Sequence, residues 1–219
     1  MPAIKKKDFV EVEYTGKIKE DNIVFDTTDS EIAKKNNIFA AKMQYGPVIV
    51  CIGEGQILKG LEDGLEGKET GKEYTIELKA ENAFGKKDAR LIKMIPAGAF
   101  RKQAIDPQPG LEVNIDGVLG IIRRCGGGRC LVDFNHPLAG KDLIYKIKVN
   151  KLVADDKEKV KSYLKLALGS KTEAEFKEST VDVKTEKEIP KEVKESISKK
   201  LAEIIPSVKK VNFVIKESK

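Results

Sequence analysis

The stretch CGGGRC, residues 125–130, holds the residue types most capable of reactive chemistry, because two thiols flank a run of glycines. A structural zinc site needs about four Cys or His ligands and a catalytic one about three. The only further candidates are Cys51, inside an apolar run, and His136. The C-x4-C spacing also differs from the C-x2-C of zinc knuckles and thioredoxin-like redox sites. We therefore interpret CGGGRC as a glycine-rich hairpin loop, with a metal site and a redox pair as the alternatives.

The bulk composition narrows the class of protein. A chain of 219 residues with 40% hydrophobic residues is long enough for one or two domains with a packed core. The net charge is +6, but both signs are interspersed and KKK at 5–7 is the longest basic run, which favours a solvated surface over a nucleic-acid patch. No apolar stretch is typical of a signal peptide or a membrane span. We expect a soluble cytoplasmic protein whose three cysteines are reduced.

The first 85 residues predict one sheet with short helices. DFVEVEYTG alternates apolar and polar residues, which predicts a half-buried strand ending at Gly16. IVFDTTD predicts a second strand and EIAKKNNIF a short helix. VIVCI predicts a buried strand, and after the turn GEG the spacing of Ile57, Leu61 and Leu65 predicts a helix that stops near Gly67. The alternating EYTIEL predicts a further strand.

The rest of the chain changes character twice. A segment rich in Pro, Gly and Arg follows Lys86, and within it Asp116–Gly117 predicts a tight hairpin turn. The alternating LIYKIKV predicts a last strand for the first part of the chain. After a linker near residues 150–155, DDKEKVKSYLKLALG and PKEVKESISKKLAEIIP predict amphipathic helices, and EFKESTVDVK and VNFVIK predict one strand each.

The order of YTG, VFD, VIVCIGEGQILKGLEDGLEG, AFG and LIYKIKV resembles the FKBP family of peptidyl-prolyl cis–trans isomerases. The insertion after AFG and the stretch NHPLAG resemble its SlyD-like branch. The resemblance covers roughly residues 3–152. It implies an FKBP-like bent antiparallel sheet around a short helix (1–85 and 132–152) and a mainly-β inserted flap domain (86–131). The helix and strand patterns after residue 155 predict a separate small αβαβ C-terminal domain (155–219), so the expected fold class is α+β.

The resemblance also implies an apolar trough that binds the substrate proline. In it, Asp26 would accept a hydrogen bond from the Tyr14 hydroxyl, and the amide of Leu58 would orient the substrate carbonyl. By position, the catalytic residues would be Tyr14, Phe25, Asp26, Leu58, Phe84 and Tyr145, and the substrate-binding residues of the trough would be Val48, Val50, Ile57 and Leu61. The residue pattern alone would assign the apolar members to an ordinary core and Asp26 to the start of a turn.

Two positions depart from the pattern of the family. Leu61 stands where many relatives have tryptophan, so leucine would close the floor of the trough less widely. Phe84 stands where a tyrosine is common, which removes a hydroxyl that could reach the substrate carbonyl.

The inserted segment and the C-terminal segment imply partners. Met94, Ile95 and Phe100 carry more apolar surface than a unit of about 45 residues hides easily, and the resemblance implies that this insert binds unfolded chains. Open sheet edges predict a homodimer through residues 155–219, with a module that docks a different partner as the alternative. No histidine-rich tail is present, so no metal or other cofactor is expected. We expect unfolded or nascent polypeptides with Xaa-Pro bonds as partners, and neither nucleic acid nor membrane.

The sequence thus predicts an isomerase of Xaa-Pro bonds whose insert is a chaperone that holds unfolded proteins. Two alternatives remain open. One is a non-catalytic chaperone or adaptor that binds proline-containing segments, and the other is a basic nucleic-acid module.

Overall fold

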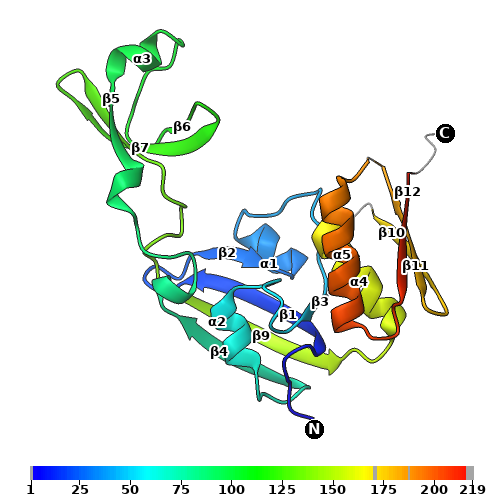
Figure 1. Cartoon of the computed structure of the whole chain (residues 1–219). Helices are drawn as coiled ribbons and strands as arrows, with labels where there is room; N and C mark the ends of the chain where they lie inside the picture. The colour runs from blue at the N-terminus through cyan, green and yellow to red at the C-terminus, as the bar shows by residue number, and fades with distance from the viewer. Residues whose placement is uncertain (1, 170–171, 187, 216–219) are drawn as a thin grey trace. The chain divides into compact units, whose positions relative to one another are not determined.

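The protein is an α+β structure with two compact parts (Figure 1). The computed structural model describes residues 2–169, 172–186 and 188–215. One part, here called the main unit, combines the chain before Lys79 with the chain after Asp142, and the other, here called the insert, is Lys79–Asp142. The predicted fold class is confirmed. Among the described helices, none is long and apolar enough to cross a membrane.

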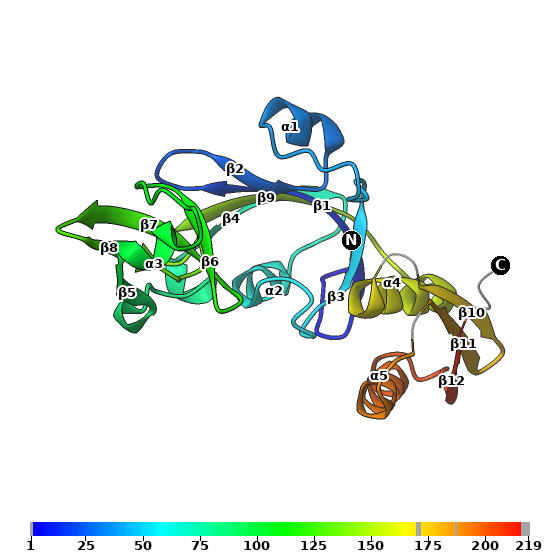
Figure 2. The same cartoon turned by 90° about the horizontal axis from the view of Figure 1, so that it is seen from above.

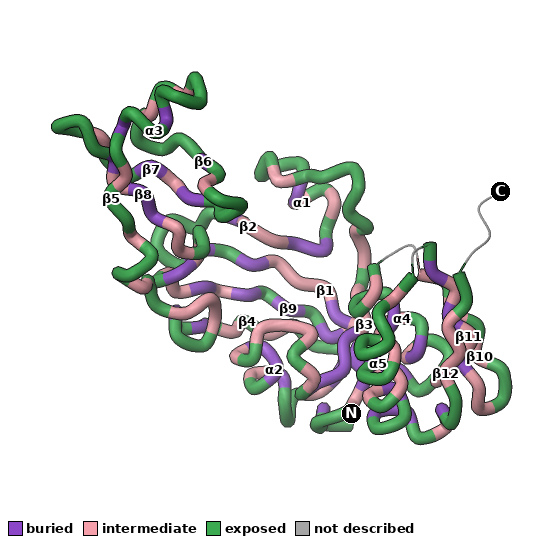
Figure 3. Tube along the Cα trace, turned by 45° about the horizontal axis from the view of Figure 1, so that its top comes forward, coloured by how far each residue is buried: buried purple, intermediate pink, exposed green. Residues whose placement is uncertain are grey.

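An antiparallel sheet forms the centre of the main unit. Its path runs β2 (Val24–Thr27), β1 (Phe9–Ile18), β9 (Leu143–Leu152) and β4 (Lys72–Leu78), and β3 (Val48–Cys51) pairs with the first half of β1. Residues of β1 alternate between the two faces, and Figure 3 shows buried segments of β1 and β9 alternating with intermediate or exposed ones. The predicted end of β1 at Gly16 is wrong: the strand continues to Ile18 through an irregularity after Gly16.

Two short helices belong to this sheet. The predicted helix after the second strand is α1 (Ser30–Lys35), which begins where Asp29 accepts hydrogen bonds from two amides of its first turn. The helix α2 (Lys59–Leu65) contacts β4 and buries Leu61 and Leu65. Gly64 makes that contact possible, because a Cβ at this position would lie 2.9 Å from Cδ1 of Ile76. The predicted bent sheet around a short helix is therefore present.

The C-terminal subdomain, residues 156–215, has a different order of elements from the predicted αβαβ. It consists of α4 (Asp156–Leu168), β10 (Glu173–Lys177), β11 (Thr180–Thr185), α5 (Lys191–Ile204) and β12 (Lys210–Ile215). The segment EFKESTVDVK, predicted as one strand, is a hairpin, because Glu178 adopts a left-handed conformation (φ 54°) and turns the chain. β10 and β12 are the edges of this sheet, and the homodimer through residues 155–219 stays a prediction.

The C-terminal subdomain shares a hydrophobic core with the sheet of the main unit. Phe9 of β1 and Cys51 of β3 pack in one cluster with Leu164 of α4 and Leu201 of α5. Figure 2 shows α4 between β3 and the sheet β10–β12, and α4 contacts both β3 and β10. The predicted linker near residues 150–155 is short and is held against β1 by a backbone hydrogen bond, since the amide of Val153 donates to the carbonyl of Phe9. The two regions are therefore one packed body.

The insert has its own sheet and its own core. Its elements are η1 (Ala80–Asn82), η2 (Ala89–Leu91), β5 (Ile92–Pro96), α3 (Ala97–Arg101), β6 (Glu112–Ile115), β7 (Val118–Gly126) and β8 (Arg129–Asp133), and its strand order is β5-β8-β7-β6. The predicted hairpin turn at Asp116–Gly117 is confirmed, with φ values of 53° and 84°. The predicted flap domain, 86–131, lies inside this compact unit, which extends further at both ends.

The stretch CGGGRC is a hairpin turn, as predicted. Gly127 and Gly128 take left-handed conformations between β7 and β8, a backbone that glycine adopts readily. Cys125 and Cys130 face each other across the turn with Cα atoms 4.1 Å apart, and they form a disulfide. The expectation that all three cysteines are reduced is therefore wrong for this pair. Cys51 is free, and burial raises the pKa of its thiol to about 12, which leaves it unreactive.

The shared core predicts a large effect of one substitution in α4. Leu164→Ala should lower the free energy of unfolding by roughly 2–5 kcal/mol, because it leaves a cavity between α4 and the sheet. Urea denaturation followed by circular dichroism measures this change. Leu166→Ala is the matched control, because Leu166 is exposed on the same helix and its loss should cost less than about 0.5 kcal/mol. Equal losses in both variants would contradict the shared core.

Candidate active site

The pairing of β1 with its two neighbours brings three predicted site residues together. Gly16 of β1 lies opposite Asp26 of β2 on one side and opposite Tyr145 of β9 on the other. A Cβ at Gly16 would lie 2.8 Å from Cε1 of Tyr145 and 2.9 Å from Cζ of Phe25. The missing side chain therefore lets both rings close over the strand. Sequence reasoning treated Gly16 only as a strand end, although the motif YTG contained it.

Aromatic rings form the centre of the site. The Tyr145 ring is 3% exposed and lies 5.9 Å from the Tyr14 ring, centroid to centroid. The Phe25 ring meets Tyr145 edge to face at 5.7 Å and an interplanar angle of 85°. Edge-to-face contacts of this kind are favourable and fix the orientation of the rings. The four predicted residues Tyr14, Phe25, Asp26 and Tyr145 thus form one cluster.

A carboxylate lies beside these rings. Asp26 and the Tyr14 hydroxyl form a hydrogen bond, which is the pairing that the resemblance implies. Burial raises the pKa of Asp26, and the hydrogen bonds from Tyr14 and from the amide of Thr27 oppose that shift. Burial and then the nearby Asp26 charge raise the pKa of Tyr14. Asp26 lies inside β2, and Asp29 caps the following helix, so Asp26 does not start a turn.

Two threonines hold the backbone of Tyr14 in place. The Thr28 hydroxyl oxygen accepts from the Tyr14 amide at 2.9 Å. The Thr27 hydroxyl donates to the Tyr14 carbonyl at 3.1 Å and also bonds to the Thr15 hydroxyl. Sequence reasoning missed this role, because Thr27 and Thr28 read as turn residues. Thr27 and Thr28 are both buried. Their burial indicates a positioning role, and it is seen only in the structure.

The remaining trough residues of the main unit lie on β3 and at the start of α2. Val50 and Leu61 are buried, and Val48, Ile57 and Leu58 are partly exposed. Leu58 is the N-cap of α2, and its carbonyl accepts from the amides of Leu61 and Glu62. Its own amide donates no hydrogen bond within the part of the chain that the structure describes. That amide is therefore available to a carbonyl of a bound peptide.

Comparison with curated proteins identifies the family of this site. The chain is 36% identical over 146 residues to a short-type peptidyl-prolyl cis–trans isomerase from Methanocaldococcus jannaschii, which is 67% of this chain and 92% of that protein. It is 34% identical over 108 residues to an FKBP-type 16 kDa peptidyl-prolyl cis–trans isomerase from Escherichia coli, covering 47% of this chain and 72% of that protein. The chain belongs to the FKBP-type peptidyl-prolyl cis–trans isomerases.

The SlyD-like branch of the family also fits. SlyD from Vibrio cholerae is 32% identical over 108 residues, covering 47% of this chain and 53% of SlyD. The family model described as the IF domain of FKBP26 matches residues 93–138. This match lies within the insert of the isomerase and overlaps most of the predicted flap domain.

The other predicted site residues of this isomerase lie in the insert. The Phe84 ring stacks on the His136 ring at 4.4 Å with an interplanar angle of 2°. Met94 is 61% exposed and Ile95 is half-buried, whereas Phe100 is 3% exposed in the core of the insert. Phe100 therefore supports the fold of the insert and offers no surface to a client. The roles of Phe84, Met94 and Ile95 in substrate binding stay predictions.

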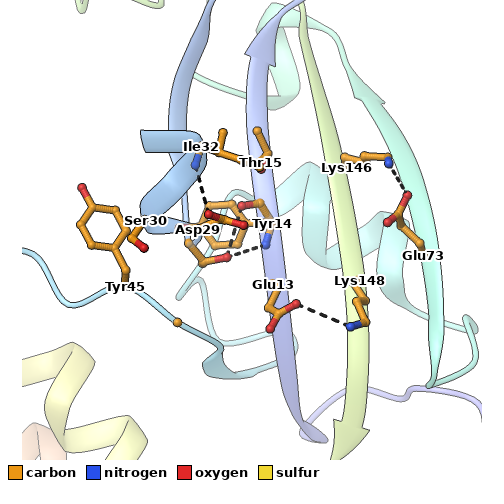
Figure 4. A pocket seen from close by; sticks show the side chains of 12 residues that line it. Glu13, Tyr14, Thr15, Asp29, Ser30, Ile32, Tyr45, Glu73, Lys146 and Lys148 are labelled. Atoms are coloured by element: carbon orange, nitrogen blue, oxygen red, sulfur yellow. Dashed lines mark hydrogen bonds and ion pairs between the residues drawn. The ribbon is translucent and has the colours of Figure 1, made fainter. Parts of the chain in front are cut away.

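The isomerase also has a polar hollow of about 530 Å³ beside α1 (Figure 4). Most of its charged side chains come from the strand positions that alternate with the trough residues, so they lie on the opposite face of the sheet. Its ion pairs join Glu13 to Lys148 and Lys146 to Glu73. Thr28, at its margin, is the residue that holds the Tyr14 backbone. The four strand charges of the hollow are paired with each other and Asp29 caps α1, so we assign the hollow a supporting role.

The raised pKa of Asp26 predicts a pH dependence of stability. A raised pKa in the folded state means that folding favours the protonated carboxyl. Its contribution is complete below the ordinary value of 3.8 and is lost as the pH rises through the folded-state value. The side chain introduced by Asp26→Asn stays neutral at every pH. The free energy of unfolding of this variant should therefore increase relative to that of the wild type as the pH rises from about 3.5 to about 7. Urea denaturation across this range measures the difference, and a constant or shrinking difference would contradict the burial of a charged Asp26.

Proposed function

We propose that the aromatic cluster around Gly16 catalyses cis–trans isomerisation of Xaa-Pro bonds in unfolded or partly folded proteins. The observation that supports this most is the closure of Phe25 and Tyr145 over Gly16 beside the Asp26–Tyr14 pair. The apolar ring of proline packs well against aromatic rings, and the hydrogen-bonded carboxylate keeps the Tyr14 ring in one orientation.

The chemistry asks for no nucleophile and no metal. The Xaa-Pro bond has partial double-bond character, and rotation about it crosses a barrier of about 18–20 kcal/mol. The planar ground state is the more charge-separated state, with electron density on the oxygen. A dry apolar pocket solvates that dipole less well than water does, whereas the twisted state, which has lost resonance, suffers less. Each 1.4 kcal/mol or so removed from the barrier gives about a tenfold gain in rate.

Each part of the site has a distinct role in this proposal. The rings of Phe25 and Tyr145 exclude water from the proline and pack against it. The amide of Leu58 donates to the substrate carbonyl and fixes the rest of the peptide while the bond rotates. Asp26 holds Tyr14, and the threonines behind β1 hold the backbone of Tyr14.

Substitution of a residue of the cluster should lower turnover and leave the fold intact. Asp26→Ala or Tyr145→Ala should lower kcat/KM for a short prolyl peptide by about tenfold or more, the effect of losing roughly 1.4 kcal/mol of barrier lowering. A protease-coupled isomerisation assay measures this, and circular dichroism checks that each variant is folded. Unchanged rates in folded variants would instead favour an adaptor that binds proline-containing segments without turning them over.

We further propose that the insert holds unfolded chains near the isomerase site. Apolar side chains on its surface support this: Met94 on β5 and Leu119 on β7 are 61% and 68% exposed. Such side chains bind apolar segments of many sequences, because the hydrophobic effect is not directional. Holding a client on the insert raises the concentration of its prolines at the site of the same molecule.

The proposed division of labour predicts that two substrates respond differently. The double variant Met94→Ser/Leu119→Ser should slow catalysed, proline-limited refolding of a protein by about tenfold, since tethering contributes gains of that size or more. Turnover of a short prolyl peptide should stay at the wild-type rate. Leu166→Ser, which removes an exposed leucine outside the insert, is the matched control and should change neither rate. Equal losses with both substrates would refute the role of the insert.

A further inference from the structure

The sequence of the loop that leads into α2 does not by itself fix the backbone conformation of that loop. Residues 52–58 connect β3 to α2 and end at Leu58, whose amide is free to bind a substrate carbonyl. Within it, Glu54 stands between Gly53 and Gly55, which have φ values of 88° and 67°. Glycine adopts many backbone conformations at similar energy. The shape of the loop therefore depends on the contacts that hold it.

Contacts within the main sheet and α2 hold the two flanks of the loop. The Cys51 amide donates to Oε1 of Gln56 at 2.7 Å, which folds the loop back onto β3. The Gly55 amide donates to Oε1 of Glu62 at 2.9 Å, which ties the loop to α2. The side chain of Glu54, at the tip between the two glycines, has its partner elsewhere.

That partner belongs to the C-terminal subdomain. Nζ of Lys200, on α5, lies 2.7 Å from Oε2 of Glu54. The Glu54 side chain is 6% exposed and the Lys200 side chain 36% exposed. Exposed ion pairs contribute little to stability. A buried carboxylate is different, because removal of its cation leaves a charge without compensation and forces the loop to rearrange.

The same helix also reaches the start of the loop. Lys200 contacts Glu203 at 3.3 Å, and Glu203 contacts Lys7 at 3.0 Å. The amide of Lys7 donates to the carbonyl of Ile52, and the amide of Ile52 donates to the carbonyl of Asp8. The side chain of Leu201, next to Lys200 on α5, packs in the core that contains Phe9 and Cys51. Helix α5 is therefore fixed against the sheet; it contacts the tip of the loop directly and is linked to the start of the loop through Lys7.

We propose that Lys200 and Glu54 are positioning residues for the isomerase reaction: the C-terminal subdomain, through this ion pair, sets the conformation of the loop that presents the Leu58 amide to the substrate. This inference rests on the proposed role of that amide. Among the described residues, the ion pairs of Lys200 join it to Glu54 and Glu203, and Glu54 lies in the loop itself, so the proposed effect on turnover passes through the loop. In this proposal the C-terminal subdomain contributes to the rate of isomerisation as well as to the stability of the fold.

The test measures turnover and loop dynamics in the full-length protein. Lys200→Met and Glu54→Gln remove the charges and keep the length of the side chains. Each should lower kcat/KM for a short prolyl peptide by about three- to tenfold, since small displacements of a positioned group lower rates strongly. The double variant should lose no more than either single variant, because the two residues act as one unit. Lys200→Arg should keep most of the activity, and amide exchange of residues 53–58 should become faster only in the variants whose turnover falls.

Two controls separate this inference from simple destabilisation and from the proposed function. Lys191→Met removes a lysine from an exposed pair on the same helix and should leave turnover and exchange unchanged. Unchanged turnover in Lys200→Met, or an equal loss of turnover in Lys191→Met, would overturn the inference. In the same assay, loss of activity in Asp26→Ala tests the proposed site separately. If the wild type fails to turn over the peptide, the proposed function fails, and the exchange of residues 53–58 still decides whether Lys200 holds the loop.

Discussion

The close approach of two aromatic rings across a residue without a side chain is the interaction on which the site depends. β1 is paired on both sides, so its backbone is fixed by hydrogen bonds along its length. Where Gly16 interrupts its side chains, the rings of Phe25 and Tyr145 fill the space. The rigid strand gives the rings a fixed floor, and Asp26 and Tyr14 lie partly buried beside these rings. Packing, burial and hydrogen bonding therefore act on the same few atoms.

The two roles that we propose for the molecule place opposite demands on a surface. A proline trough must be rigid and dry, and its residues are held by a central sheet and by threonines behind it. A surface for unfolded chains must be exposed and tolerant, and the insert carries such apolar side chains over a small core closed by α3 and by the disulfide between Cys125 and Cys130. Because the insert has its own core, its surface can be apolar without weakening the trough.

Much of this was predictable from local patterns. Alternating residues gave β1, β4 and β9, and helical spacing gave α2, α4 and α5, because these elements bury one face each. The residues Tyr14, Phe25, Asp26 and Tyr145 came from motif order alone, since nothing in their spacing distinguishes a trough from a core.

The features that were missed depend on geometry that a pattern of residue types does not encode. The disulfide depends on cross-strand register, and the hairpin at Glu178 depends on one left-handed residue. The role of Thr28 and the proposed role of Lys200 depend on partners 14 and 146 residues away.

The sharing of one core by two regions has a consequence for evolution and engineering. Phe9, Ile49 and Cys51 point away from the trough, toward the C-terminal helices. In a shortened chain that ended after β9, these side chains would face water at the edge of the sheet and invite self-association. A shorter relative with the same trough must carry polar residues at the equivalents of these positions or cover them in another way. The identity of the residue at position 9 should therefore track the length of the chain among relatives.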